Sequence, residues 1–304
     1  MESYIKLKRS HCLLLKDTPL FMLNNDKRFV LYKSENKSLD NFLYAKPEFP
    51  ELYIRGKDRQ QSIAEITHAL NIKLYQKLKS NGLKKVKEIF IELFDESVSD
   101  LSNRSLDCLP ETIEMVFKES LRNSDMLLQL TKISNKHYSL AEHSANVMFF
   151  VMNYCIHCNC QESEVRRLSL SGLLHDVGKI HLPDHICIAD HFLTDDEYNL
   201  FKSHTTLGHD TLEKNNFKDS IAIGALEHHE RLDGSGYPAG KTSISFEGQL
   251  LGIINSFEHI TYREKSYRKA KRPFDAMSII KDETLQQGKF DKEIFSDLCK
   301  SLVG

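Results

Sequence analysis

The stretch EHHERLDGSGYPAG, residues 227–240, places two adjacent histidines, His228 and His229, directly before a loop that contains three glycines and a proline. Glycine allows backbone conformations that other residues resist and proline stiffens a turn, so DGSGYP continues neither a helix nor a strand. A loop of this kind is often a tight surface turn and nothing more. Its position directly after a histidine pair favours a binding site that other parts of the chain must complete.

The composition of the whole chain excludes several classes of protein. The 304 residues include 41 lysine and arginine residues against 43 aspartate and glutamate residues, so no basic field is available to hold nucleic acid or a membrane surface. No apolar run approaches the roughly 20 residues of a membrane span, and the N-terminus lacks the apolar core of a signal peptide. Seven irregularly spaced cysteines favour reduced thiols over a disulfide framework. We therefore expect a cytoplasmic protein.

The hydrophobic period of the chain changes near Gly56. Before this point the segments YIKLK, CLLL, LFML, RFVLY and ELYI alternate in the manner of strands. From Gln60 onward apolar residues recur at helical spacing, and helical patterns continue to the end of the chain. These patterns predict a small β-rich N-terminal domain over residues 1–56, a helical connecting region over 57–124 and a helical domain over 125–304.

A run of lysines opens the connecting region and allows two interpretations. The run consists of Lys73, Lys77, Lys79, Lys84, Lys85 and Lys87. It could dock an acidic partner, but charge runs on helices are more often solvated faces. Acidic residues follow the run at once, which further weakens the docking interpretation. We therefore interpret the run as a solvent-exposed helix face.

Metal-ligand residue types recur in four segments of the C-terminal part. Three segments add to the histidine pair: AEHSANVMFFVMNYC with His143, SEVRRLSLSGLLHDVGKIHLPD with His175 and Asp176, and FKSHTTLGHDTL with His204. One buried histidine is ordinary core packing, whereas five histidines with an adjacent aspartate are improbable as packing alone. Imidazole and carboxylate ligands suit iron, manganese, zinc or cobalt. The sequence therefore predicts a metal site.

The pentapeptide HDVGK, residues 175–179, ends one of these predicted helices. We expect the helix to end near Gly178, with a left-handed residue at its C-cap. Adjacent helical residues project about 100° apart, so His175 and Asp176 cannot easily chelate one ion from the same side. They can instead reach two ions that lie side by side, and a carboxylate can bridge metals about 3.5–4 Å apart.

Together, HDVGK, His204, HHERLDGSGYP at 228–238 and SYRKA at 266–270 strongly resemble the HD-GYP family, a branch of the HD-domain metal-dependent phosphohydrolases. The resemblance covers residues 125–304. It implies an all-helical HD-type bundle for this region and therefore an α+β fold overall. It also implies a phosphodiesterase that hydrolyses cyclic di-GMP to linear pGpG or onward to GMP, with two divalent transition-metal ions, iron or manganese, as cofactors.

The same resemblance implies roles for individual residues. The implied metal ligands are His143, His175, Asp176, His204, His228, His229 and, at the position of the family's last metal aspartate, Asn255. Asp176 would bridge the ion held by His143 and His175 to the ion held by the other three histidines, and it would orient a metal-bridging hydroxide for attack on phosphorus. The implied substrate contacts are Lys179, Tyr237, Lys265 and Arg268. Lys179 would also serve catalysis by pairing with a phosphate oxygen.

Three departures from the family pattern bear on the metal site. Family members with three metals carry a glutamate where this chain has Ser139, so we expect two ions. Asparagine can coordinate through its carbonyl oxygen but brings no charge, so the ion beside Asn255 should be held less tightly. The aspartate that follows in the family pattern is replaced here by Glu258.

These departures leave a second function open, a cyclic dinucleotide sensor with little turnover that signals through the N-terminal domain to a protein partner. A hydrolase for another phosphoester is a third candidate, because one fold can host several activities. The cysteine-rich segment YCIHCNC, residues 154–160, has a spacing that could serve zinc. No second half of a structural zinc site follows it in the sequence, so we interpret the segment as the end of a helix.

Overall fold

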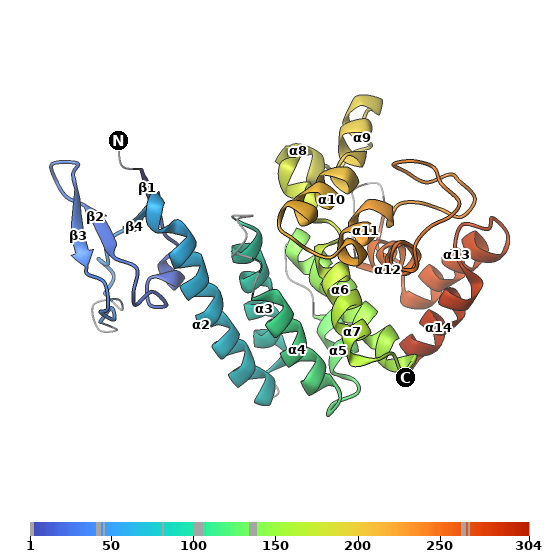
Figure 1. The fold of residues 1–304 in the computed structure, drawn as a ribbon, viewed down its shortest axis with the longest axis horizontal. Coiled ribbons are helices and arrows are strands. Elements are labelled where there is room, and N and C mark those ends of the chain that lie inside the picture. The colour runs from blue at the N-terminus through green and yellow to red at the C-terminus, as the bar shows by residue number, and fades with distance from the viewer. Residues whose placement is uncertain are drawn as a thin grey trace.

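The computed structural model shows a small sheet at one end of a long helical body (Figure 1). The residues described are 3–40, 44, 46–80, 82–99, 106, 108–133, 139–262, 266 and 268–303. Within these ranges, no helix combines the length and the apolar character needed to cross a membrane. The predicted α+β fold with an all-helical C-terminal part is confirmed.

The N-terminal sheet is formed by four antiparallel strands among the described residues. Their order is β1 (Tyr4–Lys6), β4 (Leu52–Arg55), β2 (Leu20–Leu23) and β3 (Phe29–Lys33). The strand predicted for CLLL is wrong, because these residues form turns after the short helix η1 (Arg9–His11). Cys12 and Leu15 are nevertheless fully buried. Their apolar character reflects burial in the core, which an irregular turn can achieve as well as a strand.

The chain becomes helical where the change in period predicted it. The helices α2 (Arg59–Lys79), α3 (Leu83–Val98), α4 (Leu109–Ser120) and α5 (Met126–Lys132) follow the short turn η2 (Gly56–Asp58). In Figure 1, α2 lies between the sheet and the helices α3 and α4. A continuous cluster of buried apolar side chains extends from the sheet through these helices into the C-terminal bundle. The proposed division into three domains at residues 56 and 124 stays a prediction.

The lysine run is only partly the solvated face that the sequence suggested. The lysines at 73, 77, 79, 84 and 85 are exposed, but the side chain of Lys87 on α3 is only 1% exposed. Lys87 lies three residues before Phe90 and seven before Phe94, so all three share one face of the helix. That face packs against the C-terminal bundle, which places a lysine inside the protein.

The C-terminal bundle is arranged around one buried helix, α6. Its elements are α6 (Leu140–His157), α7 (Glu162–Leu174), η3 (Val177–His181), α8 (Asp184–Cys187), α9 (Asp195–Lys202), α10 (His204–Lys214), α11 (Asp219–Glu227), α12 (Phe246–Tyr262), α13 (Pro273–Leu285) and α14 (Lys292–Val303). Helix α6 packs against α3, α5, α7, α12 and α14. Its sequence is apolar on nearly every side, as expected for a helix without a solvent face. This packing fixes the first turn of α6 beside α12.

Candidate metal centre

The five predicted histidines and Asp176 come together at the ends of helices in the bundle. His143 lies in the first turn of α6, the pair His175–Asp176 follows α7, His204 begins α10, and the pair His228–His229 follows α11. All are buried except His229, which is partly buried. The structure thus confirms the convergence of these side chains that the sequence predicted, while their roles as ligands stay predictions.

The backbone fixes the tautomer of three of these rings. In each, Nδ1 lies against the carbonyl oxygen of the residue three positions earlier: His175 to Gly172 at 2.7 Å, His204 to Phe201 at 2.5 Å and His228 to Ala225 at 2.9 Å. A carbonyl oxygen can only accept a hydrogen bond, so Nδ1 carries the proton. The lone pair is then on Nε2, which faces the centre of the cluster and is the form that binds metal.

For His143, a carboxylate instead of a backbone carbonyl fixes the tautomer of the ring. Nδ1 of His143 donates to Oε2 of Glu258 at 2.8 Å, and the other oxygen of Glu258 accepts from Nδ2 of Asn146 at 2.8 Å. A carboxylate behind a ligating imidazole holds the ring and increases its basicity. Glu258 therefore orients His143. Sequence reasoning had noted Glu258 only as the replacement of a family aspartate and had missed Asn146, which shares a helix face with His143 at a spacing of three.

The two oxygens of Asp176 face two separate pairs of imidazoles. Oδ2 lies 3.2 Å from Nε2 of His143 and 3.5 Å from Nε2 of His175. Oδ1 lies 3.3 Å from Nε2 of His204 and 3.5 Å from Nε2 of His228. Within the pairs, the Nε2 atoms are 3.1 Å apart in the first and 3.4 Å apart in the second. Asp176 is thus placed between two groups of donor atoms.

Burial sets the charge of this cluster. It lowers the pKa of His204 to about 3 and depresses the pKa values of His175, His228 and His229 as well. These imidazoles are therefore neutral at physiological pH and keep the lone pairs that a metal requires. Burial also opposes ionisation of Asp176, but the Lys179 ammonium and the neighbouring imidazoles outweigh it and hold that pKa well below its usual range. The carboxylate is charged.

The donor set fits transition-metal ions. Nine buried side-chain nitrogen or oxygen atoms of the described residues lack a hydrogen-bond partner, and three of them belong to predicted ligands: Oδ1 of Asp176, Nε2 of His229 and Oδ1 of Asn255. Nitrogen and oxygen ligands at roughly 2.0–2.2 Å from one ion lie about 3 Å from each other, which is the spacing of the facing atoms here. Orphaned acceptors at this depth are costly unless a cation satisfies them. Asn255 thus stays a candidate ligand.

The loop after the histidine pair is fixed by backbone contacts. Gly234 has a positive φ of 79°, and a Cβ on Gly236 would lie 2.4 Å from the carbonyl oxygen of His229, so neither position accepts a side chain without strain. The buried carboxylate of Glu230 accepts hydrogen bonds from the backbone amides of Ala239, at 2.7 Å, and Lys241, at 3.2 Å. Sequence reasoning gave Glu230 no role, yet it closes this loop.

The loop places Tyr237 directly against the cluster. The ring of Tyr237 stacks on His229 with 4.6 Å between centroids and 20° between planes. Burial raises the pKa of the Tyr237 hydroxyl, which therefore stays protonated and can donate a hydrogen bond. The structure thus places Tyr237 beside the histidine pair, while its contact with substrate stays a prediction.

Gly178 has a different purpose from the one predicted. Helix α7 ends at Leu174, and Gly178 lies inside η3 without a positive φ, so the predicted left-handed C-cap at this residue is wrong. A Cβ on Gly178 would lie 2.0 Å from the carbonyl oxygen of His204 and 2.5 Å from the amide of Gly208. The glycine is required because η3 and α10 approach closely, and this contact positions His204 beside Asp176.

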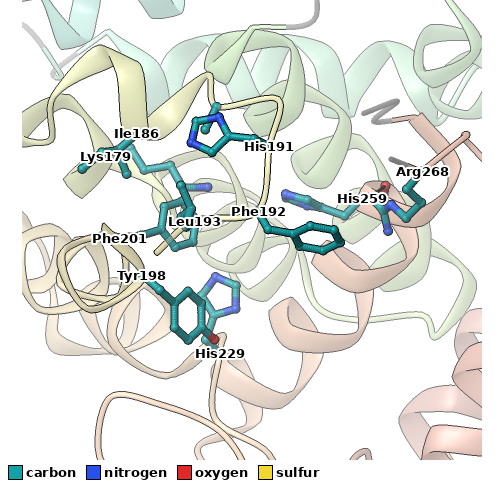
Figure 2. A pocket seen from close by; sticks show the side chains of 11 residues that line it. Lys179, Ile186, His191, Phe192, Leu193, Tyr198, Phe201, His229, His259 and Arg268 are labelled. Atoms are coloured by element: carbon teal, nitrogen blue, oxygen red, sulfur yellow. Dashed lines mark hydrogen bonds between the residues drawn. The ribbon is translucent and has the colours of Figure 1, made fainter. Parts of the chain in front are cut away.

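A cavity of about 390 Å³ opens beside the cluster. Its lining combines His229, His259 and the cations Lys179 and Arg268 with the aromatic side chains of Phe192, Tyr198 and Phe201. Figure 2 shows Lys179 and Arg268 on opposite sides of the pocket, with Phe192 between them. Such a pocket offers positive charge for phosphate and aromatic surface for stacking.

The predicted phosphate contacts lie only partly within the described residues. Nζ of Lys179 pairs with Oδ2 of Asp176, and Nη2 of Arg268 donates to the carbonyl oxygen of His259 at 2.9 Å. Lys265 lies outside the described residues. Asn255 lines a neighbouring cavity of about 260 Å³ that shares His229 and Arg268 with the first. His259, which the sequence analysis did not single out, lines both cavities and forms a further group of possible metal ligands with His143 and Glu258.

Two other predictions concern residues around α6. Ser139 is the N-cap of α6, where its Oγ accepts from the amide of Glu142 at 3.1 Å. The side chain of Ser139 is exposed, and its hydrogen bond caps the N-terminus of α6. Helix α6 ends at His157, within the segment YCIHCNC. Cys155, which lies in the helix, is buried. The possible metal-binding groups among the described residues contain no cysteine.

Comparisons with known proteins identify the family of the chain. The sequence matches the HD domain family over residues 128–294, more than half of the chain. A cyclic di-GMP phosphodiesterase from Thermotoga maritima is 29% identical over 246 residues, which are 78% of this chain and 61% of that protein. A 3'3'-cGAMP-specific phosphodiesterase 1 from Vibrio cholerae is 27% identical over 177 residues, 58% of this chain and 41% of that protein.

The fold also has a counterpart among solved structures. Bd1817, a HDG"Y"P protein from Bdellovibrio bacteriovorus, superposes with a TM-score of 0.66 at 16% identity, covering 99% of this chain and 100% of that one. This likeness concerns the fold, while the sequence match to the family includes the HDVGK and HHERLDGSGYP motifs. The resemblance drawn from those motifs is confirmed, and the chain belongs to the HD domain family.

Proposed function

We propose that this protein is a metal-dependent phosphodiesterase of the HD-GYP type that hydrolyses cyclic di-GMP to linear pGpG. The observation that carries the proposal is the position of Asp176, with each carboxylate oxygen facing a different pair of imidazoles. The names of the curated relatives support a cyclic dinucleotide as substrate. The chain spans less than two thirds of the length of these relatives.

The chain's own residues supply the rest of the chemistry. Two divalent ions, of which iron and manganese suit nitrogen and oxygen ligands, would activate water and offset phosphate charge. One would be held by His143 and His175 and the other by the remaining three histidines, with Asp176 between them. Lys179 and Arg268 would bind phosphate oxygens from opposite sides of the pocket. The Tyr237 hydroxyl, neutral because its ring is buried, would donate a hydrogen bond to the substrate.

Lys179→Met should separate phosphate binding from metal binding. The ammonium lies beside Asp176 at the edge of the pocket and is assigned to a phosphate oxygen, so its loss should leave metal content nearly unchanged. A hydrogen bond between charged groups contributes roughly 2 kcal/mol, so kcat/KM should fall about 30-fold or more. Elemental analysis and steady-state kinetics measure the two effects.

Lys202→Met is the matched control for this experiment. Lys202 lies on neighbouring α9 with Nζ 5.0 Å from the Tyr198 ring centroid, outside the pocket lining. It should retain both metal and kcat/KM. Loss of metal in Lys179→Met, or equal losses of activity in both variants, would show that Lys179 has a different role.

The proposed activity can be tested directly. Metal-loaded protein is incubated separately with cyclic di-GMP, 3'3'-cGAMP and a simple phosphodiester such as bis(p-nitrophenyl) phosphate, and the products are resolved by chromatography. We expect pGpG from cyclic di-GMP at the highest kcat/KM. Binding of cyclic di-GMP without product would identify a sensor instead, and preference for another ester would contradict the substrate assignment.

A further inference from the structure

A buried lysine connects helix α3 to the candidate metal centre. The side chain of Lys87 is 1% exposed, and its Nζ donates to Oδ1 of Asn146 on α6 at 2.8 Å. It also donates to the backbone carbonyl of Ile133 and lies 3.5 Å from Oε1 of Glu142. Burying an ammonium is unfavourable unless it is paired and hydrogen-bonded, and these contacts meet that requirement.

The contacts of Lys87 continue into the metal centre as a chain of hydrogen bonds. Asn146 accepts from Lys87 through Oδ1 and donates through Nδ2 to Oε1 of Glu258 at 2.8 Å. Oε2 of Glu258 in turn accepts from Nδ1 of His143 at 2.8 Å. Nε2 of His143 lies 3.2 Å from Oδ2 of Asp176. Asn146 and Glu258 are fully buried, so water does not compete for these bonds.

The chemistry of Lys87 gives the chain a direction. An ammonium only donates, so it must face the oxygen of the Asn146 amide, and the NH2 group of that amide must then face Glu258. The carboxylate of Glu258 can only accept, so it favours the same orientation, and the two contacts together hold the Asn146 amide at both ends. Without Lys87, Oδ1 of Asn146 would lose this donor, the amide would be held at one end only, and Glu258 would hold the His143 ring less firmly.

We propose that Lys87 is a positioning residue for the metal centre, acting through Asn146 and Glu258 on the ring of His143. Lys87 lies on α3, outside residues 128–294 that match the HD domain family, so a helix of the connecting region contributes to the site. A shift of α3 relative to α6 would change how His143 is held. The inference rests on the proposed metal-dependent function, and its test measures metal binding without turnover.

The experiment compares Mn²⁺ affinity in full-length variants by calorimetric titration of metal-free protein. Lys87→Met keeps the length of the side chain and removes its donors, and Asn146→Ala interrupts the chain while Lys87 keeps Glu142. Changes to groups that hold a metal ligand typically lower affinity about 10–100-fold, and we expect a loss of this order in both variants for one ion only. Lys87→Arg, which retains charge and donors, should recover much of the affinity.

A buried hydrogen bond of similar length elsewhere provides the control. Oγ1 of Thr112 on α4 donates to Oδ1 of Asn71 on α2 at 2.7 Å, with both side chains buried and neither in the chain described above. Thr112→Val should lower thermal stability and leave Mn²⁺ affinity unchanged. A double variant, Lys87→Met with Asn146→Ala, should lose no more affinity than the more affected single variant, because both act through one path.

Each outcome of the Mn²⁺ titrations either supports or overturns the positioning role of Lys87. Wild-type affinity in Asn146→Ala, or an equal loss in Thr112→Val, would overturn the positioning role even if Lys87→Met were too unstable to purify. If the unmodified protein binds no Mn²⁺, both the proposed function and this inference fail. If it binds Mn²⁺ without hydrolysing cyclic di-GMP, only the substrate assignment fails, and the affinity comparison still tests Lys87.

Discussion

Asp176→Asn should release at least one of the two proposed ions and reduce turnover by about 10³-fold or more, since several kcal/mol of transition-state stabilisation would be lost. The amide has the shape of the carboxylate but only one acceptor oxygen. Its NH2 group would therefore face the Nε2 lone pairs of one imidazole pair. The negative charge that the ions share would also be lost. Elemental analysis and product formation from cyclic di-GMP are the measurements.

His204→Ala is the informative partner of this variant. His204 faces only Oδ1 of Asp176, so its removal should weaken one ion and spare the ion beside His143 and His175. Asp275→Asn, at a half-buried position on α13 whose carboxylate pairs with Arg272, should change neither metal content nor turnover. Full occupancy by two ions in Asp176→Asn would mean that this carboxylate does not lie between metals.

Asn255→Asp should tighten metal binding by at least about 10-fold. Oδ1 of Asn255 is buried without a hydrogen-bond partner, as expected for an atom that faces a cation. A charged ligand binds a divalent ion more strongly than a neutral one, and changes outside the ligand set alone shift affinity about 10–100-fold. The added charge also makes bound water less acidic, so the rate can move in either direction. Mn²⁺ affinity is the measurement to use.

Asn153→Asp controls for the added charge. Nδ2 of Asn153 on α6 donates to the backbone carbonyl of Ser301 at 2.7 Å, at the α14 side of the helix. The same substitution there should leave Mn²⁺ affinity unchanged. If Asn255→Asp binds metal no more tightly than the unmodified protein, Asn255 is not a ligand. The next residue to change would then be Glu258, which contacts His143 directly.

The sequence was most informative where one residue type has few alternative uses. Five histidines and Asp176 in four segments predicted a common site, and the structure brings those side chains together. Glycine was harder to interpret, because it serves both left-handed turns and close contacts. Gly178 was assigned to a left-handed turn, but it is needed for a close contact with the backbone of α10 at His204. His204 lies 26 residues further along the chain, so the local sequence did not indicate this contact.

Charged residues were the main source of error. Lys87 was grouped with its exposed neighbours in the lysine run, although its spacing from Phe90 and Phe94 marks the buried face of α3. Its partners lie 46 and 59 residues away, and such pairings depend on how helices pack. For the same reason, the sequence did not indicate that Glu230 closes the loop or that Glu258 holds His143.

The hydrogen bonds from His175, His204 and His228 to carbonyls three residues earlier have a consequence for how the protein acquires metal. Each ring is oriented by its own stretch of backbone, before any ion arrives. The donor atoms are therefore preorganised in the folded apoprotein, and little conformational entropy remains to be lost on binding. Metal can therefore bind after the chain has folded. In this respect the site differs from small zinc modules, whose ligands assemble only as the chain folds around the ion.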